Sequence, residues 1–370
     1  MKRDYFQLLR LYIIIKEDER MTIEMRREVI QTDRLKISYL TQGNPEKQPL
    51  VLIHGNVSSN LFWTEALETL SKDFWVLAPD LRGYGETEAL PIDGSRGVRD
   101  WSDDLQSFFQ SLKISQPAHI VGWSLGGGVA MQYAIDHAEN VKSITLISPI
   151  SPFGFGGTKD EKGTPCYENF AGSGGGTANP EFADLIKQQN RSEESANSPR
   201  NVMNQFYFKP PYRAPKDLEE LFVTSMLTTR IGEGFYPGGF ETCTEWPGVS
   251  PKEDGINNAM SPKFLDLSAF KNIPNKIPVL WVRGEADLIV SDQSFLDFGN
   301  LGKLGYVEGW PGEGIFPPQP MVSQTRYVLD QYAANGGRYE EFIVENAGHS
   351  AHLEVPEVFY SKLKSFYTEM

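Results

Sequence analysis

The sequence predicts an α/β protein: a doubly wound, mostly parallel sheet covered by helices, with one large segment inserted into it. Short apolar runs rich in Val, Ile and Leu alternate with longer helix-like stretches, which is the pattern of parallel strands joined by helical crossovers. The apolar runs show little polar alternation, as expected of strands buried on both faces. This alternation of strand-like and helix-like segments stops after Pro149 and resumes near residue 272, which indicates an insertion.

Seven apolar runs are expected to be strands, and they begin near Ile37, Leu50, Trp75, His119, Ile144, Val279 and Glu341. Helix-like stretches lie at residues 60–71, 98–112, 125–137, 324–334 and 356–367. Together these predict a core made of residues 26–149 and 272–370. Residues 150–271 lack this strand–helix alternation but contain a helix-like stretch at 218–230. We expect them to form a mainly helical or irregular cap over the site.

Composition narrows the classes of function. The chain has 370 residues, enough for one large α/β domain with an added subdomain. Its net charge of −14 disfavours nucleic acid and anionic membrane as partners, because both need a basic surface. The two cysteines, Cys166 and Cys243, have no spacing typical of zinc, and nothing in it favours a disulfide. The five histidines are scattered, so no metal or cofactor is expected.

Residues 1–25 are predicted to be an N-terminal extension outside the fold. Basic residues precede an apolar stretch, as in a signal peptide, but Arg10 interrupts the stretch and residues 16–20 are charged where a cleavage site would lie. The stretch is also too short to span a membrane. Met21 and Met25 are alternative starts. We therefore expect a cytoplasmic protein, and the sequence carries no prediction of its oligomeric state.

The most informative stretch is Gly122-Trp123-Ser124-Leu125-Gly126, which lies between an apolar run and the helix-like residues 125–137. Gly-x-Ser-x-Gly between a strand and a helix is typical of a nucleophile elbow. The turn is so tight that its flanking positions need glycine, which has no Cβ. We predict that Ser124 is a nucleophile and that the Leu125 amide points to where an oxyanion would form.

Four further segments, each following an apolar run, complete a recognisable pattern. They are His54-Gly55-Asn56, Asp80-Leu81-Arg82-Gly83-Tyr84-Gly85, Gly284-Glu285-Ala286-Asp287 and Ala347-Gly348-His349. From about residue 35 to residue 367, apart from the insertion, the chain resembles the α/β-hydrolase family, in its serine-nucleophile branch of esterases and lactonases. The resemblance implies a hydrolase whose catalytic residues follow the order Ser, Asp, His.

The resemblance assigns a catalytic triad of Ser124, Asp287 and His349. A serine hydroxyl needs a base, histidine titrates near neutral pH, and a carboxylate fixes the tautomer of the histidine. Glu285 and Asp292 are rivals for the acid. His352 is the rival for the base; a packing role is the favoured interpretation of this residue, and lining the pocket or capping the next helix are alternatives.

The oxyanion hole and the substrate pocket are predicted from the surrounding segments. Besides Leu125, the second oxyanion donor is expected to be the Asn56 amide, with the Asn56 side chain as an alternative. The predicted pocket residues are Trp123, His352, Phe206, Tyr207 and Trp310. Phe206 and Tyr207 begin an aromatic cluster at residues 206–212, and Trp310 lies in an irregular stretch at residues 299–320 that forms either a pocket wall or a rigid surface loop.

Glycine-rich stretches at residues 154–157 and 172–176 suggest that the cap is mobile. The leading functional hypothesis is a cofactor-independent serine hydrolase that cleaves a carboxylic ester or lactone of a small, moderately apolar molecule. Serine in place of aspartate at the elbow favours acyl transfer to water over displacement at carbon. Three alternatives remain: a hydrolase of carbon–carbon bonds in β-diketone-like compounds, a cofactor-free haloperoxidase, and a non-catalytic binding protein.

Overall fold

The computed structural model describes residues 25–369, and an eight-stranded sheet forms the centre of this part of the chain. The strand order is β1-β2-β4-β3-β5-β6-β9-β10, and only the pairings of β2 with its neighbours β1 and β4 are antiparallel. The strands are β1 Arg26–Gln31, β2 Lys36–Gln42, β3 Pro49–Ile53, β4 Trp75–Pro79, β5 Ala118–Trp123, β6 Val141–Ile147, β9 Pro278–Gly284 and β10 Arg338–Val344. The predicted fold class is therefore confirmed.

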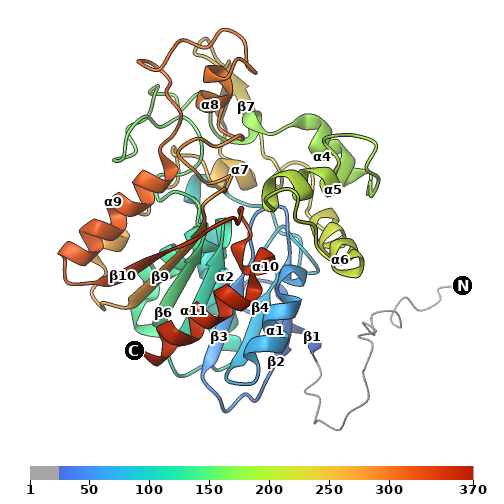
Figure 1. Ribbon diagram of the computed structural model, residues 1–370, viewed down its shortest axis with the longest axis vertical. Coiled ribbons are helices and arrows are strands. Elements are labelled where there is room, and N and C mark those ends of the chain that lie inside the picture. The colour runs from blue at the N-terminus through green and yellow to red at the C-terminus, as the bar shows by residue number, and fades with distance from the viewer. Residues whose placement is uncertain (1–24, 370) are drawn as a thin grey trace, which may run out of the picture.

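Helices cover both faces of this sheet. They are α1 Thr64–Leu70, α2 Arg99–Ser111, α3 Leu125–His137, α9 Met321–Ala334, α10 Ala351–Glu354 and α11 Pro356–Thr368. In Figure 1, α1 and α11 lie in front of the central strands. Every residue of β3 and β5 is buried, which explains why their sequences are continuously apolar rather than alternating.

The predicted strands are all present, and the differences from the predictions have physical causes. The prediction missed β1, whose first three residues, Arg26, Arg27 and Glu28, are charged because the strand lies at the sheet edge with one face in solvent. The predicted helix at residues 60–71 divides into a 3-10 turn, η1 Asn60–Trp63, and α1. The stretch expected to be irregular contains a short helix, α8 Phe298–Lys303, capped by the Asp297 side chain.

The insertion lies above the sheet in Figure 1. Its elements are short. They are η4 Gly175–Thr177, α4 Pro180–Lys187, α5 Pro199–Val202, the π-helical turn η5 Met203–Tyr207, α6 Lys216–Leu227, β7 Phe240–Thr242, β8 Val249–Pro251, α7 Ile256–Ala259 and η6 Ser268–Asn272. Cys166 and Cys243 are free thiols.

The glycine-rich stretches of the insertion are packed, which corrects their interpretation as flexible loops. Gly172 and Gly175 are buried, and a Cβ on either would collide with Phe316 or with the backbone of Gly238. Their amides are also bonded: Gly172 N–H donates to the Val249 carbonyl at 2.9 Å, and Gly175 N–H donates to Asn258 Oδ1 at 2.8 Å. Glycine is needed here for close packing rather than for mobility.

The predicted extension, residues 1–25, lies outside the described residues except for Met25, which directly precedes β1. Among residues 25–369, no helix combines the length and apolarity needed to cross a bilayer. The cytoplasmic location stays a prediction.

Hydrogen exchange tests the corrected interpretation of the glycines. The Gly172 and Gly175 amides are expected to exchange slowly, because both are buried and bonded. Gly314 is a matched control in the same chain, since it is exposed and a Cβ there would meet nothing within 4 Å. If the Gly172 and Gly175 amides exchanged as fast as the Gly314 amide, the packed interpretation would be wrong and the flexible-loop interpretation would be favoured.

Candidate active site

Ser124 lies at the sharp turn from β5 into α3. Its backbone has φ 56° and ψ −120°, which is rare for a residue with a side chain. A Cβ at Gly122 would collide with the Gly126 carbonyl, and a Cβ at Gly126 would collide with the carbonyls of Ile53 and His54. Both glycines of the motif are therefore required by close backbone packing, and Ser124 has the geometry of a nucleophile elbow.

Asp287 and His349 form a buried hydrogen-bonded pair. His349 Nδ1 lies 2.9 Å from Asp287 Oδ2, and both side chains are 2% exposed. The other carboxylate oxygen accepts the amides of Ile289 and Val290 at 2.8 and 3.0 Å, which fixes the carboxylate in place. Because Nδ1 is engaged, Nε2 is the nitrogen left to act as a base.

The rival residues lie in other environments. Glu285 is exposed. Asp292 accepts the amides of Val322 and Ser323 at 2.8 and 3.1 Å, and so caps the first turn of α9. The structure therefore brings Asp287, and neither rival carboxylate, to the imidazole of His349.

His352 is packed in the core behind the site. Its ring is completely buried and lies 4.7 Å from the ring of Trp63 and 5.4 Å from that of Trp123, centroid to centroid. Within the described part of the chain, neither of its nitrogens has a hydrogen-bond partner. Burial, with a smaller contribution from the charge of nearby His349, lowers the pKa of His352 to about 3. This neutral, enclosed ring matches the packing interpretation.

The loop after β3 approaches Ser124 closely. A Cβ built on Gly55 would lie 3.0 Å from the Cβ of Ser124. The side chain of Asn56 is already hydrogen-bonded, because its Oδ1 accepts hydrogen bonds from the Tyr84 hydroxyl at 2.7 Å and from the Val57 amide at 2.9 Å. Its Nδ2 donates to Asn257 Oδ1 at 3.3 Å. These bonds favour the Asn56 backbone amide, rather than its side chain, as an oxyanion donor.

The second expected donor, the Leu125 amide, begins α3. The first amides of a helix have no carbonyl partner within the helix, so this N–H is free of intrahelical bonding. The positive end of the helix dipole also lies at this point and favours a developing negative charge.

His54 connects the loops that follow β3 and β4. Its Nε2 accepts the Leu81 amide at 3.0 Å, and its Nδ1 lies 2.8 Å from the Gly55 carbonyl, to which the neutral ring donates. Burial lowers the pKa of His54 to about 4, so it stays neutral at physiological pH. This arrangement supports the loop rather than providing a base.

The structure brings together some of the predicted pocket residues and separates one. Trp123 is buried, and its indole donates to the His349 carbonyl at 3.0 Å. The Tyr207 ring packs edge-on against Trp123 with centroids 5.6 Å apart, and Phe206 beside it is partly buried against the core. Trp310 lies instead in the loop after α8, where its indole donates to the Phe316 carbonyl at 2.8 Å.

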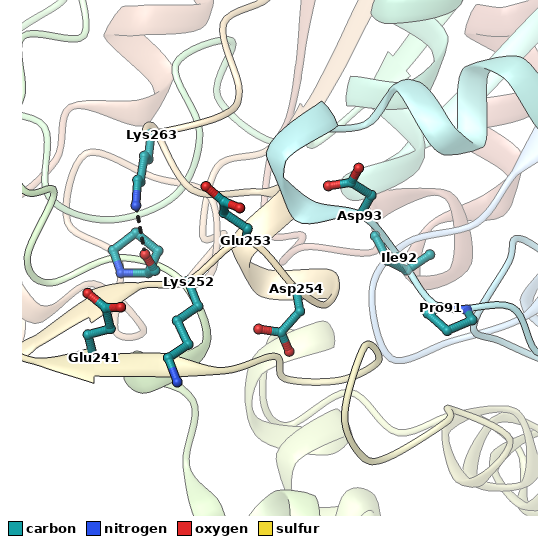
Figure 2. A pocket seen from close by; sticks show the side chains of 9 residues that line it. Pro91, Ile92, Asp93, Glu241, Lys252, Glu253, Asp254 and Lys263 are labelled. Carbon is teal, nitrogen blue, oxygen red and sulfur yellow. Dashed lines mark hydrogen bonds between the residues drawn. The ribbon is translucent and has the colours of Figure 1, made fainter.

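A surface cavity of about 590 Å³ lies away from these residues. Figure 2 shows its lining, which comes from the segment after β4 and from the region around β8. The lining residues are Pro91, Ile92, Asp93, Glu241, Pro251, Lys252, Glu253, Asp254 and Lys263. None of the predicted site residues lines this cavity. Within residues 25–369, no three His, Cys, Asp or Glu side chains gather as a metal-ligand set.

One residue near His349 was missed by the sequence reasoning. The Glu354 carboxylate accepts the Gly348 amide at 2.8 Å, directly beside His349 in the chain. A signal was present, since Glu354 lies five residues after His349 and two before Pro356, where α11 begins. A carboxylate just before a helix is typical of a helix cap. Only the folded structure shows that the Glu354 carboxylate instead accepts a hydrogen bond from Gly348, which lies earlier in the chain.

The chain matches the α/β-hydrolase fold family over residues 48–305. It belongs to that family. The predictions of the family and of an enzyme are thereby confirmed.

Individual relatives are similar over shorter segments. A 2-hydroxymuconate semialdehyde hydrolase of Pseudomonas sp. is 36% identical over 102 residues, which are 27% of this chain and 35% of the relative. A monoacylglycerol lipase of Xenopus laevis is 30% identical over 116 residues, 31% of this chain and 34% of the relative. The matched segment thus spans about a third of the length of these relatives.

Solved structures extend the likeness of fold over nearly the whole chain. An esterase of Rhodococcus sp. superposes with a TM-score of 0.57 at 20% identity, and covers 93% of this chain and 98% of its own. At this level of identity the likeness concerns the fold alone.

Replacing Asp287 by Asn is expected to lower kcat by about 10⁴-fold, because Asn cannot hold the histidine tautomer that accepts the serine proton. Steady-state kinetics on a chromogenic ester measures the loss. Glu285→Gln and Asp292→Asn are the controls. Asp292→Asn should change stability and kcat little, because the Asn side-chain oxygen can still accept the amides at the start of α9. A larger loss of kcat in either control than in Asp287→Asn would show that the acid is misassigned.

Proposed function

We propose that this protein is a serine hydrolase that cleaves a carboxylic ester or lactone through an acyl-enzyme. The observation that carries the proposal is the buried Asp287–His349 pair on loops beside the strained elbow that holds Ser124. Such a set is what a weak serine nucleophile needs: a base, and a carboxylate that orients the base. The names of the relatives, a lipase and a semialdehyde hydrolase among them, are consistent with hydrolysis.

We propose the following mechanism for these residues. Ser124 Oγ attacks the substrate carbonyl carbon while its proton passes to His349 Nε2. The carbonyl oxygen becomes an oxyanion that accepts the amides of Leu125 and Asn56, each worth roughly 3 kcal/mol in the transition state. The tetrahedral intermediate then expels the alkoxide leaving group, which takes the proton from His349. Water, deprotonated by His349, attacks the acyl-enzyme and releases the carboxylic acid and free Ser124.

The substrate class is proposed from the rings around the site. Phe62 stacks on Phe222 with centroids 4.3 Å apart and also contacts Trp123 and Tyr207. Tyr207 and Phe222 come from the insertion, so we propose that residues 150–271 act as a cap that supplies part of an apolar wall at the substrate site. We therefore propose a small, moderately apolar ester or lactone as the substrate.

A second candidate is hydrolysis of a carbon–carbon bond in a β-diketone-like compound by the same triad. The similarity to a 2-hydroxymuconate semialdehyde hydrolase favours this alternative over haloperoxidase or purely binding functions. A panel of acyl esters, lactones and β-diketones separates the candidates. Turnover of β-diketones with kcat/KM well above that of every ester and lactone would favour the alternative.

Replacing Ser124 by Ala is expected to abolish hydrolysis, because the change deletes the nucleophile and little volume. Loss of about 10⁴-fold or more in kcat is expected by comparison with other triads. Circular dichroism and thermal unfolding should show an intact fold. Turnover by the purified variant at the wild-type rate would exclude a serine mechanism.

We also propose that the reaction needs no metal or other cofactor, because the triad and the two amides supply every group that the mechanism uses. Activity after exhaustive dialysis against EDTA is expected to equal activity before it. Loss of activity in the chelator, with recovery on addition of zinc or manganese, would contradict this proposal.

A further inference from the structure

The carboxylate of Glu354 joins the His349 loop to the insertion. Its Oε1 accepts the Gly348 amide at 2.8 Å, and its Oε2 accepts the Lys209 amide at 2.7 Å. Gly348 directly precedes His349, whereas Lys209 directly follows the buried rings of Tyr207 and Phe208. One side chain therefore holds two backbone segments that are far apart in the sequence.

These two segments also touch without help from Glu354. A Cβ on Gly348 would lie 2.8 Å from the Lys209 nitrogen, so the two backbones meet at a distance that only glycine allows. On the other side of His349, the Ser350 amide donates to the Tyr207 carbonyl at 2.9 Å. The histidine thus lies between Ser350, which is hydrogen-bonded to Tyr207, and Gly348, which packs against Lys209 and is linked to it through Glu354.

Tyr207 extends this connection to the predicted oxyanion loop. Its hydroxyl donates to the carbonyls of Asn56 and Val57 at 3.0 and 3.2 Å. Tyr207 therefore contacts the His349 loop with its backbone and the Asn56 loop with its side chain. Residues 207–209 and Glu354 make up what we call the clamp.

Bonds from backbone amides to a carboxylate are stronger than bonds between neutral groups, and they cost more to lose when buried. Burial raises the pKa of Glu354, and the charge of nearby Asp287 adds to this, while the amides of Lys209, Gly348 and Ser350 act in the opposite direction. Loss of the carboxylate would leave the Gly348 amide without its acceptor one residue from the catalytic base.

We propose that Glu354 is a positioning residue, and that the clamp makes the orientation of His349 depend on residues 207–209 of the insertion. The inference rests on the proposed serine mechanism and deepens it, since it adds to the triad the group that holds its base. Misplacement of a catalytic group by about 1 Å costs on the order of 10²-fold in rate, so a small shift of the Gly348–His349 backbone is sufficient to be measured.

The test uses Glu354→Gln in the full chain. The Gln oxygen accepts one amide, but its NH₂ group then meets the other. We expect kcat to fall about 10–100-fold for small and large esters alike, with KM changed far less. The second-order rate of labelling by a fluorophosphonate should fall by a similar factor. Rates are expressed per site titrated at the labelling endpoint, so a loss of folded protein does not affect them.

Glu357→Gln is the matched control, because Glu357 is an exposed carboxylate three residues further on. Its kcat is expected to stay within twofold of wild type. Tyr207→Phe tests the other end of the clamp, since it keeps the packed ring and deletes the hydroxyl. It should also lower kcat, and the double variant should lose less than the product of the two single losses.

A per-site kcat and labelling rate within twofold of wild type in Glu354→Gln would overturn the positioning role and leave Glu354 as a purely structural link. If Glu354→Gln fails to fold, Tyr207→Phe decides, and an unchanged per-site kcat in that variant overturns the clamp. Failure of the proposed function is distinguishable from failure of the clamp. It would appear as full activity in Ser124→Ala, and that result does not depend on either clamp variant.

Discussion

The crowding of the backbone where β5 turns into α3 is the constraint on which the rest of the site depends. Gly126 packs on the carbonyls of Ile53 and His54 with no room for a Cβ. This contact fixes the helix against the end of β3, and so brings the loop that carries Gly55 and Asn56 beside Ser124. A larger residue at Gly126 would separate the two proposed oxyanion amides and would also strain the turn that holds the proposed nucleophile, Ser124.

Two further loops of the candidate site follow strands that lie on the opposite side of β5 from β3. Asp287 follows β9 and His349 follows β10, and these parallel neighbours present their carboxyl ends together. The insertion is attached to the site by hydrogen bonds from residues 207 and 209. Tyr207 is hydrogen-bonded to both the Asn56 loop and the His349 loop, and the Lys209 amide donates to Glu354, so we regard residues 207–209 as part of the framework of the site.

The sequence predicted the elements whose physical signal is local. Continuous apolar runs marked the buried strands, and Gly-x-Ser-x-Gly between a strand and a helix marked the elbow, although the steric limit on Gly126 comes from the distant carbonyls of Ile53 and His54. Predictions from the sequence were wrong or missing where contacts between distant residues determine the structure. The stretch around Gly172 and Gly175 has the composition of a flexible loop, but its glycines are required by Phe316 and Gly238. Likewise, nothing local to Glu354 indicates that Lys209, distant in the sequence, is its partner.

We propose that Ser124 forms a covalent bond with the substrate, and peptide mapping tests this step by detecting the adduct itself. The wild-type protein is treated with a fluorophosphonate, or quenched in acid during turnover of a slow ester, and its peptides are analysed by mass spectrometry. One adduct is expected, on Ser124, and it should be absent when His349 is replaced by Ala. An adduct on another residue, or turnover with no adduct at all, would contradict it.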